Sequence, residues 1–318
     1  MKIIVTGGSG FIGTNVVDYY VGKGWEVLNL DSQAPKNVEA NACWQACDIL
    51  DYDALDHAFQ AFMPDYIVHL AARTDLDGLT VDDYRANTEG VENVLRAAAR
   101  LKGLRKILIT SSMLVCHTGY IPRDQHDYAP TTRYGESKVI TEQLVWQHRP
   151  ACDWALLRPT SIWGPWFGVP YRNFFDMVRH RRYVHLGRRS CTKTYGYIEN
   201  TVYQIDAILT TPTLNETDKV FYLGDKPPVF IEEWANQIAA QLGHKIPRVP
   251  FWLMRAAALT GDVLAKVGIR FPMTSFRLRN MTTDNIIPLD NTLKIAPHPP
   301  VDRITGIRRT LDWMEHNS

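Results

Sequence analysis

A glycine-rich segment at the start of the chain constrains the fold more than any other feature. A short β-branched run, Ile3–Thr6, is followed by Gly7, Gly10 and Gly13, and a helical pattern of apolar residues begins at Phe11. Glycines at this spacing let the backbone turn tightly, approach a pyrophosphate and pack a helix on a strand. The helix N-terminus then offers free amides to phosphate. Such a turn can also be merely flexible, but its place between strand and helix predicts a nucleotide site.

Short apolar runs alternate with helical patterns through the first half of the chain. A parallel sheet with crossover helices requires this alternation. We therefore expect an α/β fold with a doubly wound parallel sheet of the Rossmann type. Strands are predicted at Ile3–Thr6, Glu26–Leu30, Tyr66–Leu70, Lys106–Ser111 and Trp154–Leu157, and helices at Phe11–Lys23, Asp53–Phe62, Asp82–Leu101 and Tyr134–His148.

Prolines become frequent beyond residue 165 and break the chain into short pieces. Residues 1–165 are predicted to form the nucleotide-binding domain, with a return of the chain to it near residues 192–215. Residues 166–318 are predicted to form mostly a smaller mixed α/β lobe that binds the substrate. Helices are expected there at Tyr171–Arg182, Ile231–Leu242, Trp252–Val267 and Ile304–Glu315.

Charge and cysteine content argue against several functions. The chain has 35 basic and 34 acidic residues, a net charge of +1, which gives no case for nucleic acid or an acidic membrane as partner. Five scattered cysteines suit reduced thiols in the cytoplasm, and Cys43 and Cys47 lack a second pair of ligands, so no metal is expected. No leader precedes the first strand, and the most apolar later segment carries charges, so we expect a soluble cytoplasmic protein.

Acidic residues follow the early strands where a dinucleotide would lie. Asp31, about twenty residues beyond the glycines, can accept hydrogen bonds from the adenosine ribose and would repel a 2′-phosphate, although it could also cap a turn. No arginine lies between residues 24 and 36, which favours NAD over NADP. Asp48 and Ile49 are placed to touch the adenine edge. Small residues that would let the backbone lie against the cofactor close the third strand: Leu70, Ala71 and Ala72.

Tyr134 and Lys138 stand four residues apart, hence on one face of a helix. A phenol has a free pKa of about 10, and a neighbouring ammonium favours the phenolate. Tyr134 could therefore exchange a proton with a substrate hydroxyl, although such a pair also occurs on surface helices. Thr110, Ser111 and Ser112 end a strand upstream, and a hydroxyl there can bind the same substrate oxygen or cap a turn.

Together these features resemble the extended short-chain dehydrogenase/reductase family, most closely its NAD-dependent epimerase/dehydratase branch, which acts on nucleotide sugars. The resemblance is clear over the first 165 residues and general beyond them. The positions that carry it are the glycine turn, Asp31, Asp48, His69-Leu70-Ala71-Ala72, Asn87, Ser112, Tyr134, Lys138 and Arg158-Pro159.

The resemblance implies a role for each matched residue. Ser112 and Tyr134 would bind the reacting hydroxyl, with Tyr134 as general base and acid. Lys138 would hold the nicotinamide ribose and lower the pKa of Tyr134, and Asn87 would steady the cofactor side. The implied NAD contacts are Gly7, Gly10, Phe11, Ile12, Gly13, Asp31, Ser32, Asp48, Ile49, Leu70, Ala71, Ala72, Asn87, Thr110, Tyr134, Lys138 and Pro159, and the implied substrate contacts are Thr74, Ser112, Ser161, Asn173 and Lys193.

Several positions depart from the family pattern. Its dehydratases place acidic residues after the catalytic hydroxyl, whereas this chain has Met113-Leu114, so dehydration is not expected and hydride transfer remains. Lys193 stands where nucleotide-sugar enzymes commonly use an arginine for the diphosphate, which keeps the charge but loses the bidentate fork. A second family arginine is replaced around His298-Pro299-Pro300.

Three interpretations remain open. The first is an NAD-dependent epimerase or keto-reductase of a nucleotide sugar that works through a keto intermediate. The second keeps the fold but takes an apolar alcohol or ketone, sterol-like or flavonoid-like, against aromatic residues of the second half: Trp163, Trp166, Phe167, Tyr171, Phe174 and Phe175. The third is a non-catalytic NAD-binding sensor, against which the intact Ser112, Tyr134 and Lys138 argue.

The family resemblance also implies a homodimer formed by two long helices, Asp82–Leu101 and Tyr134–His148. Each carries more apolar positions than one stripe facing the core needs, although all of them could belong to the core. These positions are Val91, Val94, Leu95, Val139, Leu144 and Val145.

Overall fold

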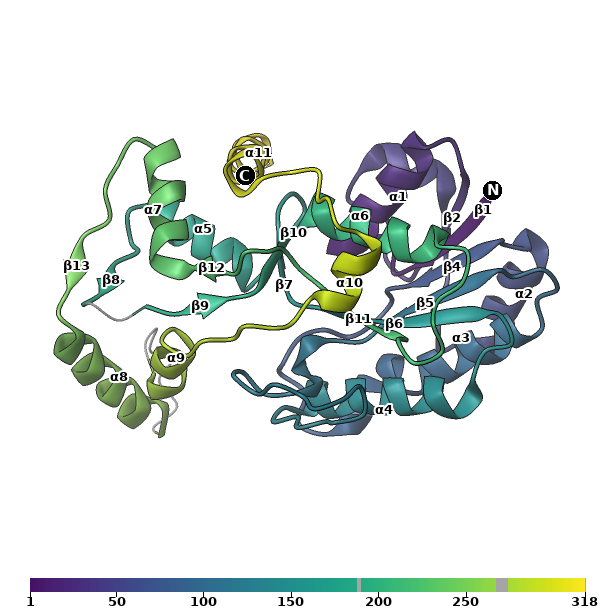
Figure 1. Ribbon diagram of the computed structural model, residues 1–318, viewed down its shortest axis with the longest axis horizontal. Coiled ribbons are helices and arrows are strands. Elements are labelled where there is room, and N and C mark those ends of the chain that lie inside the picture. Colours follow the sequence, from purple (N-terminus) through teal and green to yellow (C-terminus); the bar gives the residue numbers. More distant parts are fainter. Residues whose placement is uncertain (188–189, 267–273, 318) are drawn as a thin grey trace.

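The centre of the protein is a seven-stranded sheet in which every pair of neighbouring strands is parallel (Figure 1). The computed structural model describes residues 1–187, 190–266 and 274–317. The strand order is β11-β6-β5-β4-β1-β2-β3, so the order reverses between β1 and β4, where doubly wound sheets bind their ligands. The predicted fold class is confirmed. The strands are β1 (Lys2–Thr6), β2 (Glu26–Asp31), β3 (Trp44–Ala46), β4 (Tyr66–His69), β5 (Lys106–Thr110), β6 (Asp153–Pro159) and β11 (Val220–Leu223).

Helices cover both faces of the sheet, because successive side chains of a strand point to opposite faces. Ile3 and Val5 of β1 lie in one core with residues of α1 and α6, whereas Ile4 between them lies in the other core with residues of α2, α3 and α4. Burial on both faces explains why the strands read as continuous apolar runs. The helices are α1 (Phe11–Gly22) and α6 (Ile198–Thr210) on one face, and α2 (Tyr52–Phe62), α3 (Glu89–Ala99) and α4 (Arg133–His148) on the other. Two short 3₁₀ helices lie in connections on the sheet domain, η1 (Val38–Cys43) and η3 (Met113–Val115).

The single helix predicted at Asp82–Leu101 is wrong, because the chain breaks there into the 3₁₀ helix η2 (Val81–Asn87) and α3. The break lies at Thr88, whose φ of −118° and ψ of −80° are not helical. The Asn87 carbonyl accepts a hydrogen bond of 2.5 Å from the Thr141 hydroxyl on α4. A continuous α-helix would use that carbonyl for the amide four residues on. A contact with a distant helix thus competes with the local helical pattern.

The smaller lobe contains four helices near the predicted positions and three two-stranded sheets (Figure 1). α5 ends three residues earlier than predicted, and Val267, the predicted end of α8, lies outside the described residues. The helices of the lobe are α5 (Tyr171–Arg179), α7 (Ile231–Gln241), α8 (Phe251–Lys266), α9 (Ser275–Asn280) and α11 (Arg303–His316), whereas α10 (Asp290–Ile295) packs on α6 and β11 of the sheet domain. The strand pairs are β7 (Ser161–Trp163) with β10 (Tyr195–Tyr197), β9 (Thr192–Lys193) with β12 (Val229–Phe230), and β8 (His185–Leu186) with β13 (Arg248–Val249).

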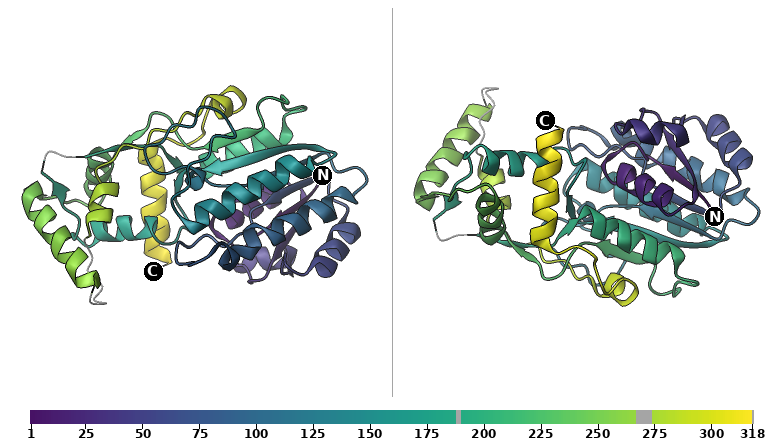
Figure 2. Two further views of the ribbon diagram at one scale, coloured as in Figure 1. Left: turned by 90° about the horizontal axis from the view of Figure 1, so that it is seen from below. Right: turned by 90° about the horizontal axis from the view of Figure 1, so that it is seen from above.

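Aromatic rings fill the core of this lobe. Trp163 lies 5.2 Å from Trp234 between ring centroids, and Phe174 stacks on Trp234 at 4.8 Å. Helix α11 crosses the junction between the lobe and the sheet domain (Figure 2), where Gly306 lies against Trp163. Trp163, Phe167 and Phe175 are at most 2% exposed and pack into this core, whereas Trp166, Tyr171 and Phe174 are partly buried.

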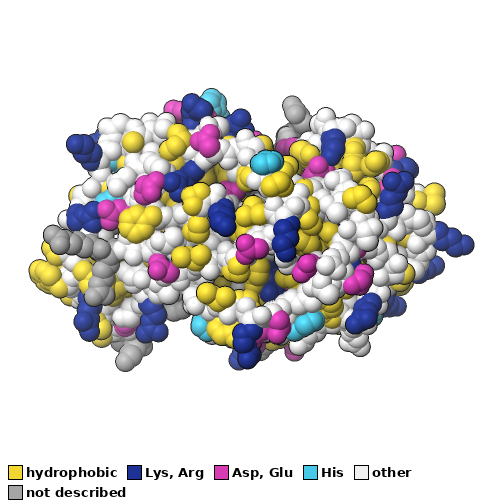
Figure 3. Space-filling model, viewed as in Figure 1, with side chains coloured by type: hydrophobic (Ala, Val, Ile, Leu, Met, Phe, Trp, Pro, Cys, Tyr) yellow, Lys and Arg dark blue, Asp and Glu magenta, His cyan; other side chains and the backbone are white. Residues whose placement is uncertain are grey.

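The apolar positions that suggested a dimer face lie mainly in the protomer's own core. Val91, Val94, Leu95 and Val145 are all buried there, and only Val139 and Leu144 are partly exposed. These residues therefore give no second apolar face, and the homodimer stays a prediction. In the part of the chain that the structure describes, no helix is long and apolar enough to cross a membrane. Basic and acidic side chains are interspersed over the face seen in Figure 3.

A cluster of buried charged side chains lies at the edge of the sheet where the strands begin, and it connects the sheet to the end of α6. Lys106 and Lys219, at most 2% exposed, both contact the carboxylate of Asp153, at 3.1 and 3.0 Å. Lys106 also donates to the carbonyls of Ile208 and Thr211 at the end of α6. Lys219 also pairs with the exposed carboxylate of Glu216 at 3.2 Å, so Asp153 is the buried partner that the two ammonium groups share.

We expect Asp153→Asn to lower the free energy of unfolding by about 3 kcal/mol, because it leaves buried Lys106 without a carboxylate and Lys219 with only the exposed carboxylate of Glu216. Urea denaturation at pH 7 measures this change. Glu26→Gln is the matched control, since Glu26 pairs with Lys2 on the surface and should contribute less than about 1 kcal/mol. Equal effects of the two substitutions would contradict the assignment.

Candidate active site

The glycine turn between β1 and α1 is shaped by backbone contacts. Gly7 has a φ of +72°, and a Cβ there would lie 2.4 Å from the amide nitrogen of Ala71. A Cβ on Gly13 would lie 2.1 Å from the Gly7 carbonyl oxygen. Gly10 precedes α1, whose N-terminus no side chain caps, and a Cβ there would meet only the Gly7 carbonyl, at 3.3 Å. The turn thus leaves an open helix N-terminus of the kind that holds a pyrophosphate. Phe11 and Ile12 form the first turn of this helix.

Asp31 lies at the end of β2, directly beside the glycine turn. Its Oδ2 accepts a hydrogen bond of 3.0 Å from the Ser9 amide, and its Oδ1 accepts one of 2.9 Å from the Gln33 amide. These bonds fix the carboxylate, and each oxygen keeps acceptor capacity for a ribose hydroxyl. The following Ser32 is exposed.

The residues predicted at the adenine edge differ in their placement. Asp48 is exposed, and its Oδ1 accepts from the Leu50 amide at 2.9 Å. Ile49 is buried in the core, and its carbonyl accepts from the Asn93 side chain at 3.0 Å. Of the two, Asp48 is the one with a side chain that a ligand can reach.

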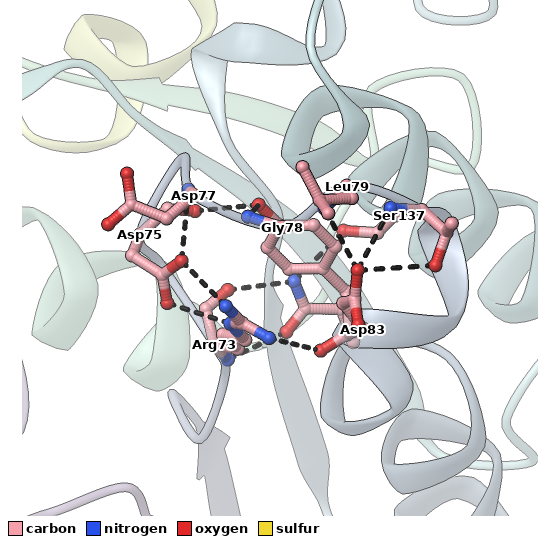
Figure 4. A network of polar contacts seen from close by, with 10 residues as sticks. Arg73, Asp75, Asp77, Gly78, Leu79, Asp83 and Ser137 are labelled. Atoms are coloured by element: carbon pink, nitrogen blue, oxygen red, sulfur yellow. Dashed lines mark hydrogen bonds and ion pairs between the residues drawn. The ribbon is translucent and has the colours of Figure 1, made fainter. Parts of the chain in front are cut away.

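Asn87 fixes the loop that follows β4 and is itself fully buried. Its Oδ1 accepts from the Arg73 amide, and its Nδ2 donates to the Arg73 carbonyl and to Ser137 Oγ on α4, each at 2.9 Å. Figure 4 shows the same loop tied together through Arg73, Asp75 and their neighbours. Asn87 therefore steadies the site by positioning a loop and a helix, and exposed Thr74 lies in that loop. Leu70, Ala71 and Ala72, between β4 and this loop, are partly buried.

Ser112, Tyr134 and Lys138 meet where β5 ends against α4. The helix begins after Thr132, whose hydroxyl accepts from the Gly135 amide at 3.0 Å. Lys138 is 1% exposed and donates to the Thr110 carbonyl at 3.0 Å. Tyr134 is 7% exposed and hydrogen-bonds Ser112, two residues beyond Thr110. The structure thus brings together the three residues predicted to be catalytic, and Pro159 ends the neighbouring strand β6.

Burial governs the ionisation of both catalytic groups. It raises the pKa of Tyr134 to about 12, and the hydrogen bond with Ser112 acts in the opposite direction. That Lys138 lowers the pKa of Tyr134 stays a prediction. Burial lowers the pKa of Lys138 to about 7, and the Glu142 carboxylate raises it in part. At neutral pH the phenol therefore carries its proton.

Ser161 and Tyr171 extend the site on the side of the smaller lobe. The Tyr171 hydroxyl donates to Ser161 Oγ at 2.9 Å, and Tyr171 lies close enough to Tyr134 to raise its pKa. Asn173, on α5, is exposed. Lys193 is not free, because its ammonium donates to the Asn280 carbonyl at 2.7 Å.

Sequence reasoning missed Tyr84 and Glu142. The Tyr84 ring lies 6.0 Å from the Tyr134 ring between centroids, and nothing in its sequence context signals this. Glu142 continues the four-residue spacing of Tyr134 and Lys138, which was a usable signal. No group of three or more His, Cys, Asp or Glu side chains suited to a metal ion occurs within the described ranges.

Residues 3–224 match the model of the NAD-dependent epimerase/dehydratase family. The chain therefore belongs to this family, a branch of the extended short-chain dehydrogenases/reductases, and it is an enzyme that uses NAD. The glycine turn, the open N-terminus of α1 and the carboxylate of Asp31 fit this cofactor.

Individual relatives differ in what they act on. A 3β-hydroxysteroid dehydrogenase/Δ5→4-isomerase of Mycobacterium tuberculosis is 28% identical over 78% of this chain and 71% of its own. A Methanocaldococcus jannaschii protein assigned as a UDP-glucose 4-epimerase is 29% identical over 99% of both chains. The UDP-glucuronic acid 4-epimerase of Bacillus cereus, solved with NAD, has a TM-score of 0.77 at 19% identity, with 99% of this chain and 97% of that chain covered. At that identity the structural likeness shows the fold.

The position of Asp31 predicts that Asp31→Ala narrows the preference for NADH over NADPH by roughly tenfold, because a negative charge that would repel the 2′-phosphate is lost. Fluorescence titration with both dinucleotides gives the two affinities. Asp48→Ala removes an exposed carboxylate of the same region and should leave the ratio near that of the wild type. An unchanged ratio of the two affinities in Asp31→Ala would show that another group determines the preference between NADH and NADPH.

Proposed function

We propose that the protein transfers hydride at a hydroxyl-bearing carbon of a nucleotide sugar, as an epimerase or keto-reductase that passes through a keto sugar. The observation that carries this proposal is the meeting of Ser112, Tyr134 and Lys138 beside the glycine turn. NAD, when bound, supplies the hydride acceptor or donor. Lys138 would hold its nicotinamide ribose, and the open N-terminus of α1 its pyrophosphate.

Tyr134 is the group that moves the substrate proton. Its phenol and the Ser112 hydroxyl both reach one substrate oxygen, which fixes that oxygen at the reacting position. Because Tyr134 holds its proton at neutral pH, it can give it to the oxygen of a ketone as that oxygen gains charge. In the opposite direction the phenolate takes the proton of the substrate hydroxyl.

At the position after Ser112, where the family's dehydratases carry an acidic residue, this chain has no side chain that could remove water from a sugar. Met113, the residue after Ser112, begins the short 3₁₀ helix η3 and offers a thioether, which does not exchange protons. Its Sδ lies 3.7 Å from the Asn285 side-chain amide. This supports a reaction limited to hydride and proton transfer.

Hydroxyl groups support a sugar as substrate. Ser161 and Tyr171 place two hydroxyls next to Tyr134, and the aromatic residues that suggested an apolar substrate lie largely in the lobe core. The M. jannaschii relative and the solved epimerases span nearly the whole chain, including this lobe. An apolar alcohol or ketone is the second candidate, since Lys193 is occupied by Asn280 and the mycobacterial relative is a steroid dehydrogenase.

Tyr134→Phe should lower kcat by roughly 10²- to 10⁴-fold, because the ring still packs but the proton carrier is gone. Steady-state assays on the nucleotide sugar identified by mass spectrometry of the co-purifying ligands measure this loss. NAD affinity should stay near that of the wild type, since the phenol is not proposed to hold the ribose. Near-native turnover would mean that a different group moves the proton.

Lys193→Met should raise the KM for the nucleotide sugar about tenfold, because a charge-assisted hydrogen bond to the diphosphate is lost. This requires that the ammonium leaves the Asn280 carbonyl when substrate binds. NAD binding serves as the control and should not change. Turnover of a 3β-hydroxysteroid together with an unchanged KM for every UDP-, GDP- and dTDP-sugar tested would favour the second candidate.

A further inference from the structure

A buried ion pair lies beneath the catalytic residues. Arg158 on β6 and Glu142 on α4 are 1% and 0% exposed and form a bidentate contact, Nε to Oε1 at 2.7 Å and Nη2 to Oε2 at 2.6 Å. The Ser111 hydroxyl donates to the same Oε1 at 2.5 Å. The carboxylate thus has a cation and a hydroxyl as partners.

The arginine is held as firmly as the carboxylate. Its Nη1 donates to the Tyr222 hydroxyl at 2.9 Å and its Nη2 to the Gln125 carbonyl at 2.8 Å. The rings of Tyr128 and Tyr222 lie 5.6 and 5.3 Å from its guanidinium carbon. Stability alone is a weak reason for such a pair, since apolar residues of similar volume often stabilise a core as well or better.

The position of the Arg158–Glu142 pair beneath the catalytic residues suggests a role other than stability. Tyr134, Lys138 and Glu142 follow one another at intervals of four along α4 and so lie on one face of the helix. Ser111, which binds Glu142, stands between Thr110, whose carbonyl accepts from Lys138, and Ser112, which bonds Tyr134. The carboxylate therefore binds the residue between the two strand-end groups that contact Lys138 and Tyr134.

Lys138 needs such a neighbour to stay charged. Its side chain is buried, and its ammonium donates to a neutral carbonyl, that of Thr110. The ionisable groups around it are Tyr134 and Glu142 on α4, His69 on β4 and, behind Glu142, Arg158 on β6. Burial lowers the pKa of His69 to about 3, so it is neutral at pH 7, and Tyr134 keeps its proton. Glu142 is the one carboxylate among these four groups, and it forms an ion pair with Arg158.

We propose that Glu142, held in place by Arg158 and Ser111, is a positioning residue that favours the protonated form of Lys138 at neutral pH. The proposal rests on the function assigned above to Tyr134 and Lys138. Its physical content, the charge on Lys138, can be measured without any turnover. A failure of the proposed reaction and a failure of this inference are therefore separate results.

The test is the titration of Lys138 in the full-length protein labelled with ¹³C-lysine. Its Cε signal is assigned by its loss in Lys138→Arg. Glu142→Gln keeps the shape of the side chain but removes the charge and leaves Arg158 unbalanced. The midpoint of the titration should therefore fall by about one pH unit or more. Glu142→Asp, which keeps the charge, should restore most of that fall.

Ser111→Ala provides the matched control, because it removes one hydrogen bond from the carboxylate and leaves its charge. Its midpoint should stay within a few tenths of a pH unit of the wild type. An unchanged midpoint in Glu142→Gln would overturn the proposal, and so would an equal fall in Ser111→Ala, since loosened packing would then be the cause.

If Glu142→Gln does not fold, the titration of Lys138 in the wild-type protein tests the proposal instead. Buried lysines without a compensating carboxylate lose their proton near pH 5–6. A wild-type midpoint above pH 6 supports the role of Glu142, and a midpoint at or below pH 6 overturns it.

Discussion

The cofactor end of the sheet depends on backbone segments that approach each other more closely than a Cβ atom permits. The Gly7 Cα lies against the Ala71 backbone at the end of β4, and the Gly13 Cα lies against the Gly7 carbonyl. These two contacts join β1, α1 and the loop after β4, and they set where the N-terminus of α1 points. Asp31 takes its orientation from the same turn through the Ser9 amide. A side chain at either glycine would therefore move the phosphate site and the ribose site together.

Below the catalytic helix the protein replaces apolar packing with a polar network that reaches from Asn87 to Arg158. Asn87, Ser137 and Thr141 join η2 to α4, and Glu142 joins α4 to β5 and β6. A buried polar group is costly unless each of its partners is in place, so this network allows few alternative positions for α4. The network therefore also restricts the positions of Tyr134 and Lys138, because both project from the same helix. The helix break at Thr88 has the same origin, since Thr141 takes the carbonyl that would have continued it.

The sequence predicted the sheet, the glycine turn and the three residues that meet at the end of β5, because these features follow from local periodicity and spacing. It predicted a return of the chain near residues 192–215 but not that α6 forms there, and it did not predict β11, because both depend on packing over a long stretch of chain. It could not tell that Trp163 and Phe175 lie in the core of the smaller lobe, since the sequence context of an aromatic residue is the same in a core and in a substrate site. It also could not predict the environment of the Tyr134 phenol. Spacing shows that an ammonium is near but not that it turns to the Thr110 carbonyl, nor how fully the phenol is buried.

The proposed reaction is easier to infer from the sequence than the substrate, because the reaction depends on the sheet domain and the substrate on the smaller lobe. The catalytic groups stand on α4 and at the end of β5, where regular elements fix their distances. The groups that would choose a substrate lie on short strands and loops of the smaller lobe, and their availability depends on contacts that cross long sequence distances. Lys193 illustrates this, because its ammonium is bound 87 residues away at Asn280. Lys193 can bind a diphosphate only if its contact with Asn280 opens. Substrate specificity therefore depends on the packing of the lobe and not on the residue type alone.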